Sequence, residues 1–273
     1  MMSQSHNKLL CLCVAVLSFS ASAPAQEAAT ATESGAAKST DWAETIKSEI
    51  SALPDRFFED AQATYFNSDN VAALLWAGLL SAGMNNSSAD DRIAEHFAEH
   101  DSFNEFGDET LDILGSPLTQ ASIAFLYSML TLDESDSVHH RCARTIQRAL
   151  ALNTVSFFTL KAARHNDTPN GKSWAWPSGH TSSSFVVASV LHEYYGLKVG
   201  IPAYIFAGAV GYRMMDTGDH WASDIAFGAT LGWVVGHTVA KKHKSPAVAG
   251  FEVLPYFGNY DAPALGISLA RRF

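Results

Sequence analysis

Apolar residues recur along most of the chain at helical spacing, and short polar or glycine-containing stretches separate the runs. Spacing of this kind predicts helices that bury one face or the whole of their surface. The predicted helices cover residues 42–50, 71–80, 93–97, 117–132, 139–163, 181–196, 199–214 and 225–235. No internal repeat is evident, so the pattern predicts an all-α helical bundle.

The C-terminal residues follow a different pattern. The stretches 251–257 and 264–273, on either side of Gly258-Asn-Tyr-Asp261, resemble two strands and the turn of a β-hairpin. We therefore expect a helical domain over 41–243, followed by a C-terminal extension over 244–273 that packs as a hairpin on the bundle.

The N-terminal residues are typical of a secretory signal peptide. Lys8 precedes an apolar run over 9–17, and small residues follow up to a cleavage position after Ala25. Residues 1–25 are thus read as a signal peptide, with an uncleaved anchor as the alternative, and residues 26–40 as a flexible linker because they lack large apolar side chains. The mature protein is expected in the periplasm or secreted.

Membrane contact is not a strong feature of the sequence. After the signal peptide no apolar run reaches 18 residues without interruption, which is typical of a soluble bundle and allows peripheral membrane contact. Oligomeric state is not indicated by any motif.

The charge balance restricts the partners. The chain has 18 Lys and Arg against 28 Asp and Glu, and loss of Lys8 with the signal peptide gives 17 minus 28, or −11. Such an acidic chain is a poor partner for nucleic acid, so any phosphate site must be a local basic pocket. Cleavage also removes Cys11 and Cys13, which leaves Cys142 without an internal disulfide partner.

Two stretches carry candidate chemistry, and each stands where an apolar helical run begins. They are Trp176-Pro-Ser-Gly-His180 and His220-Trp-Ala-Ser-Asp224. Helix N-termini present unpaired N–H groups and partial positive charge, which favours an anion. The helices over 181–196 and 199–214 are each about 24 Å long, so an antiparallel pair returns the second stretch to the first. The long preceding helix delivers Lys161 to the same end.

The side chains of these stretches are suited to phosphoryl transfer. Asp224 lies four residues after His220, on the same helix face, where it can accept the Nδ1 proton and leave Nε2 free to attack. His180 can protonate a leaving oxygen, while Lys161 and the helix-end N–H groups hold the phosphoryl oxygens. This chemistry needs neither a metal nor another cofactor.

At these residues the chain resembles the type 2 phosphatidic acid phosphatase superfamily, which also contains bacterial acid phosphatases and vanadium-dependent haloperoxidases. Its motifs are a Lys followed after six residues by Arg-Pro, a Pro-Ser-Gly-His, and a Ser-Arg followed after five residues by His with Asp four further on. The resemblance implies an all-α bundle in which His220 forms a phosphohistidine, Asp224 orients it and His180 is the general acid. It also implies that Lys161, Ser178 and Gly179 bind phosphate oxygens.

The chain departs from both arginine positions of the family. Thr168-Pro169 stands where the first motif has Arg-Pro. In the third motif the arginine position falls on Met214, and Arg213 comes one residue too early, which turns its side chain by about 100° on a regular helix. Arg213 therefore serves only if the helix end is loosened. We expect it to be the phosphate-binding cation, ahead of Arg164.

The sequence thus predicts an exported, metal-independent phosphatase that hydrolyses phosphomonoesters or lipid phosphates. A vanadate-dependent haloperoxidase, a catalytically reduced phosphate-binding homologue, and a metal hydrolase using His180, His220 and Asp219 or Asp224 are the alternatives. No segment of the sequence indicates whether the substrate carries a lipid tail or a sugar.

Overall fold

The computed structural model describes residues 53–100, 102–132, 137–244, 247–248, 251–257 and 265–270. Its helices are α3 (Leu53–Tyr65), α4 (Ser68–Asn86), α5 (Ala89–Glu99), α6 (Glu105–Gly115), α7 (Pro117–Leu130), α8 (Val138–Arg164), α9 (Gly179–Tyr195), α10 (Leu197–Asp216) and α11 (Ala222–His243). The predicted helical architecture is confirmed. The predicted signal peptide, linker and helix 42–50 lie outside the described residues.

Local signals explain several helix boundaries. Asn67 caps α4 by accepting hydrogen bonds from the N–H groups of Asp69 and Asn70. Pro117 opens α7, as its position predicted. Ser137 caps α8, which ends at His165 in the left-handed conformation.

Two helices were not predicted. The sequence from 85 to 107 is polar and acidic, and we expected only one short surface helix there. In the structure α5 is longer than expected, and α6 follows it, capped by the side chain of Asn104, which accepts a hydrogen bond from the N–H of Gly107. The helix α3 also precedes the first buried helix. The helix α3 lines an apolar cavity, and α6 carries carboxylates that contact Arg213.

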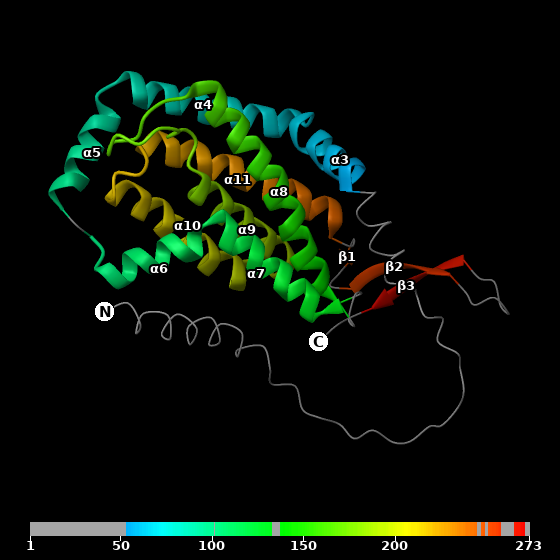
Figure 1. Cartoon of the computed structure of the whole chain (residues 1–273). Coiled ribbons are helices and arrows are strands. Elements are labelled where there is room, and N and C mark those ends of the chain that lie inside the picture. Colours follow the sequence, from blue (N-terminus) through cyan, green and yellow to red (C-terminus); the bar gives the residue numbers. More distant parts are fainter. Residues whose placement is uncertain are drawn as a thin grey trace. The chain divides into compact units, whose positions relative to one another are not determined.

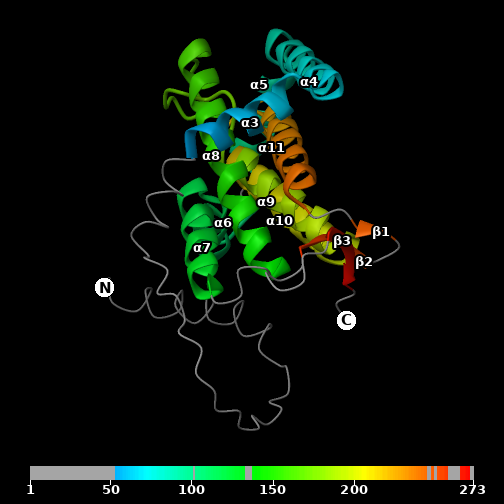
Figure 2. The same cartoon turned by 90° about the vertical axis from the view of Figure 1, so that its right-hand side faces the viewer.

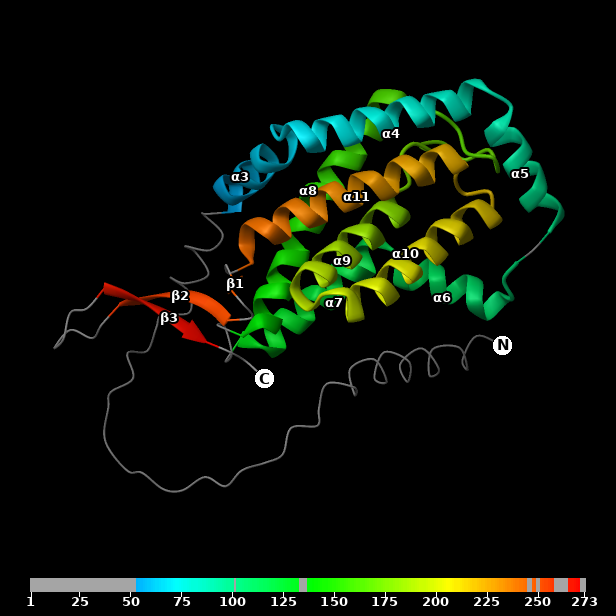
Figure 3. The ribbon, with the colours of Figure 1, turned by 180° about the vertical axis from the view of Figure 1, so that it is seen from behind.

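The helix α9 has neighbours on several sides. It packs against α8, α10 and α11, while α4 lies along α11 and α7 lies along α8 (Figure 1). Figure 2 shows α9 between α8 and α10, and Figure 3 shows α11, α9 and α10 running beside one another. The N-terminus of α9 and the N-terminus of α11 consequently share one end of the bundle.

Three glycines let α11 approach α9 very closely. They stand one turn apart on α11, at Gly228, Gly232 and Gly236. A Cβ atom at Gly228 would lie 2.8 Å from the carbonyl oxygen of Ser178, and one at Gly236 would lie 2.6 Å from that of Val186. Such distances leave no room for a side chain, so the two backbones touch.

No single helix in the described part of the chain combines the length and the apolar character needed to cross a membrane. The helices α6 and α7 meet that test only as a pair, and they are bent by 62° relative to each other.

The C-terminal strands are β1 (Ala247–Val248), β2 (Phe251–Phe257) and β3 (Leu265–Ala270), paired antiparallel in the order β1-β2-β3. In the β2–β3 ladder Glu252 pairs with Ala270 and Phe257 with Leu265. The predicted turn at 258–261 lies outside the described residues, so the hairpin connection and its packing on the bundle stay predictions.

Candidate active site

The two candidate stretches meet at the N-termini of α9 and α11. Ser178 is fully buried and caps α9: its Oγ accepts a hydrogen bond from the N–H of Thr181. Its own N–H donates to the carbonyl of Asp224 at 3.3 Å. The close approach of α11 to α9 thus places Gly179 and His180 beside the start of α11. The peptide bond between Trp176 and Pro177, which leads into Ser178, is cis.

His220 and Asp224 form a buried pair. Nδ1 of His220 lies 3.4 Å from Oδ2 of Asp224, and the same oxygen accepts the N–H of Trp221 at 3.0 Å. Asp224 is fully buried, and its Oδ1 has no hydrogen-bond partner among the described residues. With Nδ1–H directed to Asp224, Nε2 carries the lone pair that is available for nucleophilic attack.

A carboxylate that the sequence did not reveal braces this pair. Asp90, on α5, is buried, and its Oδ1 accepts the N–H of Ser223 at 3.0 Å. It therefore satisfies an unpaired donor in the first turn of α11, beside Asp224. Asp90 stands in a polar stretch with no motif around it, so no sequence signal identified it.

Lys161 lies at the same end of the bundle. Its Nζ donates to the carbonyls of Trp174 and Ala175, the latter at 3.1 Å. Burial lowers the pKa of Lys161 to about 8, although the charge of Asp224 opposes that shift. The ammonium is thus tied to the loop that precedes Ser178, and it keeps its charge below about pH 8.

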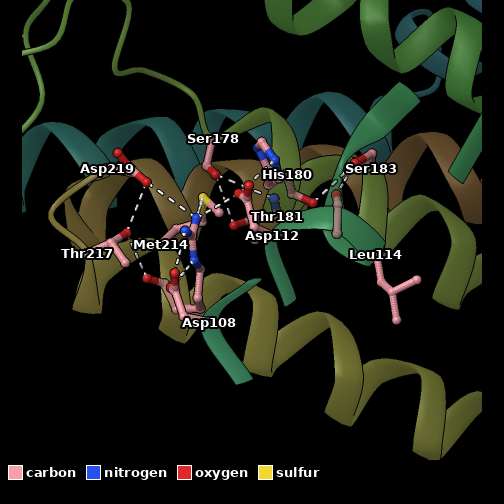
Figure 4. Close-up of polar contacts among 12 residues, drawn as sticks. Asp108, Asp112, Leu114, Ser178, His180, Thr181, Ser183, Met214, Thr217 and Asp219 are labelled. Atoms are coloured by element: carbon pink, nitrogen blue, oxygen red, sulfur yellow. Dashed lines mark hydrogen bonds and ion pairs between the residues drawn. The ribbon is translucent and has the colours of Figure 1, made fainter. Parts of the chain in front are cut away.

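His180 faces the pair from α9. Its side chain is 30% exposed, and its Nε2 lies 3.6 Å from Oδ1 of Asp112 (Figure 4). Burial lowers the pKa of His180, Asp112 opposes this effect, and the charges of His220 and Arg213 lower it further. The charge of His220 therefore reaches His180.

Arg213 is buried at this site, but carboxylates hold its guanidinium. Nε and Nη2 donate to the two oxygens of Asp108 at 2.7 and 3.3 Å, and Nη1 donates to Asp112 at 2.8 Å and to Asp219 at 3.3 Å. Figure 4 labels these three acidic residues. Burial opposes the charge, yet the hydrogen bond to Asp108 and the neighbouring carboxylates outweigh it and raise the pKa of Arg213. The sequence placed Arg213 correctly at this end but did not foresee the carboxylates from α6. Its role as a phosphate ligand stays a prediction.

The end of α10 is neither loosened nor bulged, which was the condition under which Arg213 could serve as the family arginine. The helix stays regular through Asp216, with the N–H of Thr217 bonded to the carbonyl of Arg213. The additional residue is accommodated after the helix, where Gly218 has a φ of +66° and the N–H of His220 bonds the carbonyl of Met214.

The alternative cation Arg164 and the motif position Thr168 make their hydrogen bonds to residues other than the histidines. Nη2 of Arg164 donates to Oδ1 of Asn85, and the guanidinium stacks 5.3 Å from the ring centre of Trp176. Thr168 is buried in a turn, where its hydroxyl donates to Asn170. Among the described residues, no hydrogen bond or ion pair joins Arg164 or Thr168 to either histidine. Within the residues described here, no group of three His, Cys, Asp or Glu side chains is arranged to hold a metal ion.

An apolar cavity of about 700 Å³ lies next to the site. It is open to the surface and is lined by residues of α3, α4, α8 and α11, and none of the described residues that line it is charged. Phe227 lines the cavity, three residues after Asp224, and its ring centre lies 4.4 Å from that of Trp176. Leu160, which precedes Lys161, also lines it. The cavity therefore begins within about one helical turn of the polar site.

Comparison with known proteins agrees with the motifs. Residues 144–245 match the family model described as the PAP2 superfamily. The matched range contains Lys161, Pro177–His180 and the His220–Asp224 segment. Over 65 residues the chain is 35% identical to the lipid A 1-phosphatase of Porphyromonas gingivalis. That match covers 23% of this chain and 15% of the relative, so the chain spans only a small part of that protein's length.

A solved structure shares the fold. The transmembrane PAP2 type phosphatidylglycerolphosphate phosphatase from Bacillus subtilis aligns with a TM-score of 0.54 and 18% sequence identity. The alignment covers 63% of this chain and 94% of that chain.

Proposed function

We propose that the chain, whose residues 144–245 match the PAP2 superfamily model, is a metal-independent phosphatase that hydrolyses lipid phosphates through a phosphohistidine intermediate. The observation that carries the proposal is the buried His220–Asp224 pair, 3.4 Å apart, with His180 in the same site. One histidine is oriented for attack and the other is placed to exchange a proton.

The reaction follows from these positions. The lone pair on Nε2 of His220 forms a bond to phosphorus, the ester P–O bond breaks, and the leaving oxygen takes a proton from His180. Water then attacks the phosphohistidine and gives its proton to His180, which releases phosphate and restores His220. Asp224 stabilises the positive charge of the His220 ring during both steps.

The phosphoryl oxygens would be held by groups already in place. Lys161 supplies a charge, and the first two N–H groups of α9, those of Gly179 and His180, have no intrahelical acceptor. Ser178 fixes that helix start through its cap. Arg213 joins them only if the phosphate displaces a carboxylate from its guanidinium.

The apolar cavity favours a lipid phosphate over a small phosphomonoester. A phosphate bound at Lys161 would have its ester group within reach of Leu160 and Phe227, where the cavity begins. An acyl chain buried there gains about 0.8 kcal/mol for each CH₂ removed from water. The cavity thus provides the binding energy that a short, water-soluble ester cannot use.

Exposed apolar side chains support contact with a membrane. They occupy α4, α7 and α10, and include Leu75, Trp76, Leu79, Leu80, Leu118, Phe125, Leu126, Leu130, Leu197, Ile201 and Ile205. Large apolar side chains gathered on an exposed surface are typical of a site that contacts a membrane or another protein. We propose that these helices contact lipid. The signal-like residues 1–25 support export to the periplasm or beyond.

Purified full-length protein tests the function directly. Hydrolysis of long-chain phosphatidic acid is expected to exceed that of glycerol 3-phosphate in kcat/KM, to persist in excess chelator, and to be inhibited by vanadate, which mimics the five-coordinate phosphoryl state. Loss of activity on chelation with recovery on adding zinc or magnesium would favour the metal hydrolase. Bromide oxidation by peroxide with vanadate would favour the haloperoxidase, and phosphate binding without turnover would favour the reduced homologue.

Narrowing the cavity should separate lipid from aryl substrates. Gly78 lines it, and a Cβ added there meets only a ring atom of Phe227 at 3.8 Å, so Gly78→Leu fills space without a clash at its first carbon. We expect kcat/KM for long-chain phosphatidic acid to fall about tenfold, with hydrolysis of a generic aryl phosphate nearly unchanged. Gly83→Leu on the same helix is the matched control, because a Cβ added at Gly83 would meet no atom within 4 Å. Equal loss on both substrates would contradict an acyl-binding role.

A further inference from the structure

Asp112 links His180 to Arg213. One oxygen of this carboxylate, Oδ1, lies 2.8 Å from Nη1 of Arg213 and 3.6 Å from Nε2 of His180 (Figure 4). Asp108, one turn earlier on α6, binds Nε and Nη2 of the same guanidinium. Arg213 is itself 7% exposed and so has a fixed position. The guanidinium therefore holds the carboxylate of Asp112 in front of the imidazole.

We propose that Asp112 is a positioning residue for His180, directing Nε2–H to its carboxylate so that Nδ1–H is left for the leaving oxygen of the substrate. The inference rests on the proposed phosphatase function. In it Arg213 acts through Asp112, by holding that carboxylate in place, rather than by binding the phosphate.

The proton balance of the reaction is compatible with such a partner. A histidine that donates a proton must be an imidazolium, with a proton on each nitrogen. Transfer from Nδ1 to the leaving oxygen leaves a neutral ring whose remaining proton, on Nε2, still faces Asp112. The proton of the attacking water then returns to Nδ1. The carboxylate thus fixes one tautomer through both steps, as a third group orients the base in nucleophilic sites generally.

The charges around His180 decide the direction of the pH effect. From α6 it faces Asp112, from α10 Arg213, from the following loop Asp219, and from the start of α11 His220. Burial, His220 and Arg213 disfavour the imidazolium, and Asp112 and Asp219 favour it. Asp219 is 2.7 Å from Lys172, which neutralises part of its charge. Removal of Asp112 would therefore lower the pKa of His180, and the general acid would lose its proton at a lower pH.

The test compares pH profiles of kcat/KM for the wild type, Asp112→Asn and Asp108→Asn. For Asp112→Asn we expect the alkaline limb, where the general acid is lost, to move down by about 0.5–1 pH unit. Asp108 contacts Arg213, and no contact with His180 is found for it within the described residues. An amide at position 108 can still accept the hydrogen bond from Nε of Arg213, and Asp219 still accepts from Nη1. The guanidinium and Asp112 should therefore keep their places, and the limb should stay at the wild-type pH. Asp112→Glu should restore part of the shift.

A second readout separates positioning from general structural damage. Protonation of the leaving oxygen matters most for a basic alkoxide and little for an aryl oxide. Asp112→Asn should therefore lower kcat for an alkyl phosphate about tenfold more than kcat for a nitrophenyl phosphate. An unmoved alkaline limb with equal loss on both substrates overturns the proposal, as does an Asp108→Asn variant that behaves like Asp112→Asn.

The proposal can also fail separately from the phosphatase function. The pKa of His180, followed by NMR titration of its ring protons in the wild type and Asp112→Asn, needs no turnover. A lower pKa in the variant supports the positioning role even if no substrate is hydrolysed, and an unchanged pKa overturns it even if the enzyme is active.

Discussion

Replacing His220 with alanine is expected to reduce phosphate release by at least about 10⁴-fold while leaving the helical fold intact. The imidazole is the nucleophile in the proposed reaction, and no other described side chain is oriented by Asp224 in its place. The backbone N–H of His220, which bonds the carbonyl of Met214, remains in an alanine variant. The loop that brings the α11 start to the site should therefore persist.

The measurement is a single-turnover reaction with a substrate labelled in its phosphate. Wild type should trap acid-labile, base-stable label on the protein, and His220→Ala should trap none. His237→Ala is the matched control, because His237 lies on α11 and pairs with Glu193 at 2.7 Å, away from the site. That variant should keep its rate within about threefold. Near wild-type turnover in His220→Ala would rule out the phosphohistidine mechanism.

The sequence was sufficient for the groups whose relation is local. His220 and Asp224 are four residues apart at a helix start, and Ser178 caps the helix that it immediately precedes. Both relations follow from helix geometry and need no knowledge of the tertiary structure. The position of Lys161 at the same end followed from helix lengths and short connections.

The surroundings of Arg213 could not be predicted in the same way. Asp108 and Asp112 precede it by 105 and 101 residues, and they belong to a helix that starts in a polar, acidic stretch. Their meeting depends on how α6 packs against α10, and no local spacing encodes it. A motif identifies a residue type at a position, whereas the hydrogen-bond partners of a guanidinium group depend on the whole fold.

The cavity was missed for a related reason. Its walls come from α3, α4, α8 and α11, and α3 was not among the predicted helices. Each wall residue viewed alone is an ordinary apolar side chain. Only the packing leaves space between them, so no local pattern in the sequence indicates the cavity.

The glycines of α11 recur at a spacing of four residues, which is the pattern expected of a helix face that lies close to another helix. The central one has the least room. A Cβ at Gly232 would overlap the carbonyl oxygen of Ser182 and lie 2.9 Å from the Cβ of Phe185. A carbonyl in the middle of a helix cannot move aside alone, so α11 as a whole would have to shift away from α9.

Gly232→Ala is therefore expected to destabilise the protein by about 3 kcal/mol, at the upper end of what one added methyl group costs in a packed core. It should also lower kcat/KM at temperatures where the variant is still folded. The reason is that α9 carries His180 and the start of α11 carries Asp224, so separating the helices moves the two halves of the site apart.

Gly208→Ala on α10 is the control. Its Cβ would meet nothing within 4 Å, and the exchange should stabilise the helix by up to about 1 kcal/mol without changing the rate. The measurements are thermal unfolding and kcat/KM on both variants. A Gly232→Ala protein with wild-type stability and rate would mean that the backbones of α9 and α11 are not in close contact at Gly232.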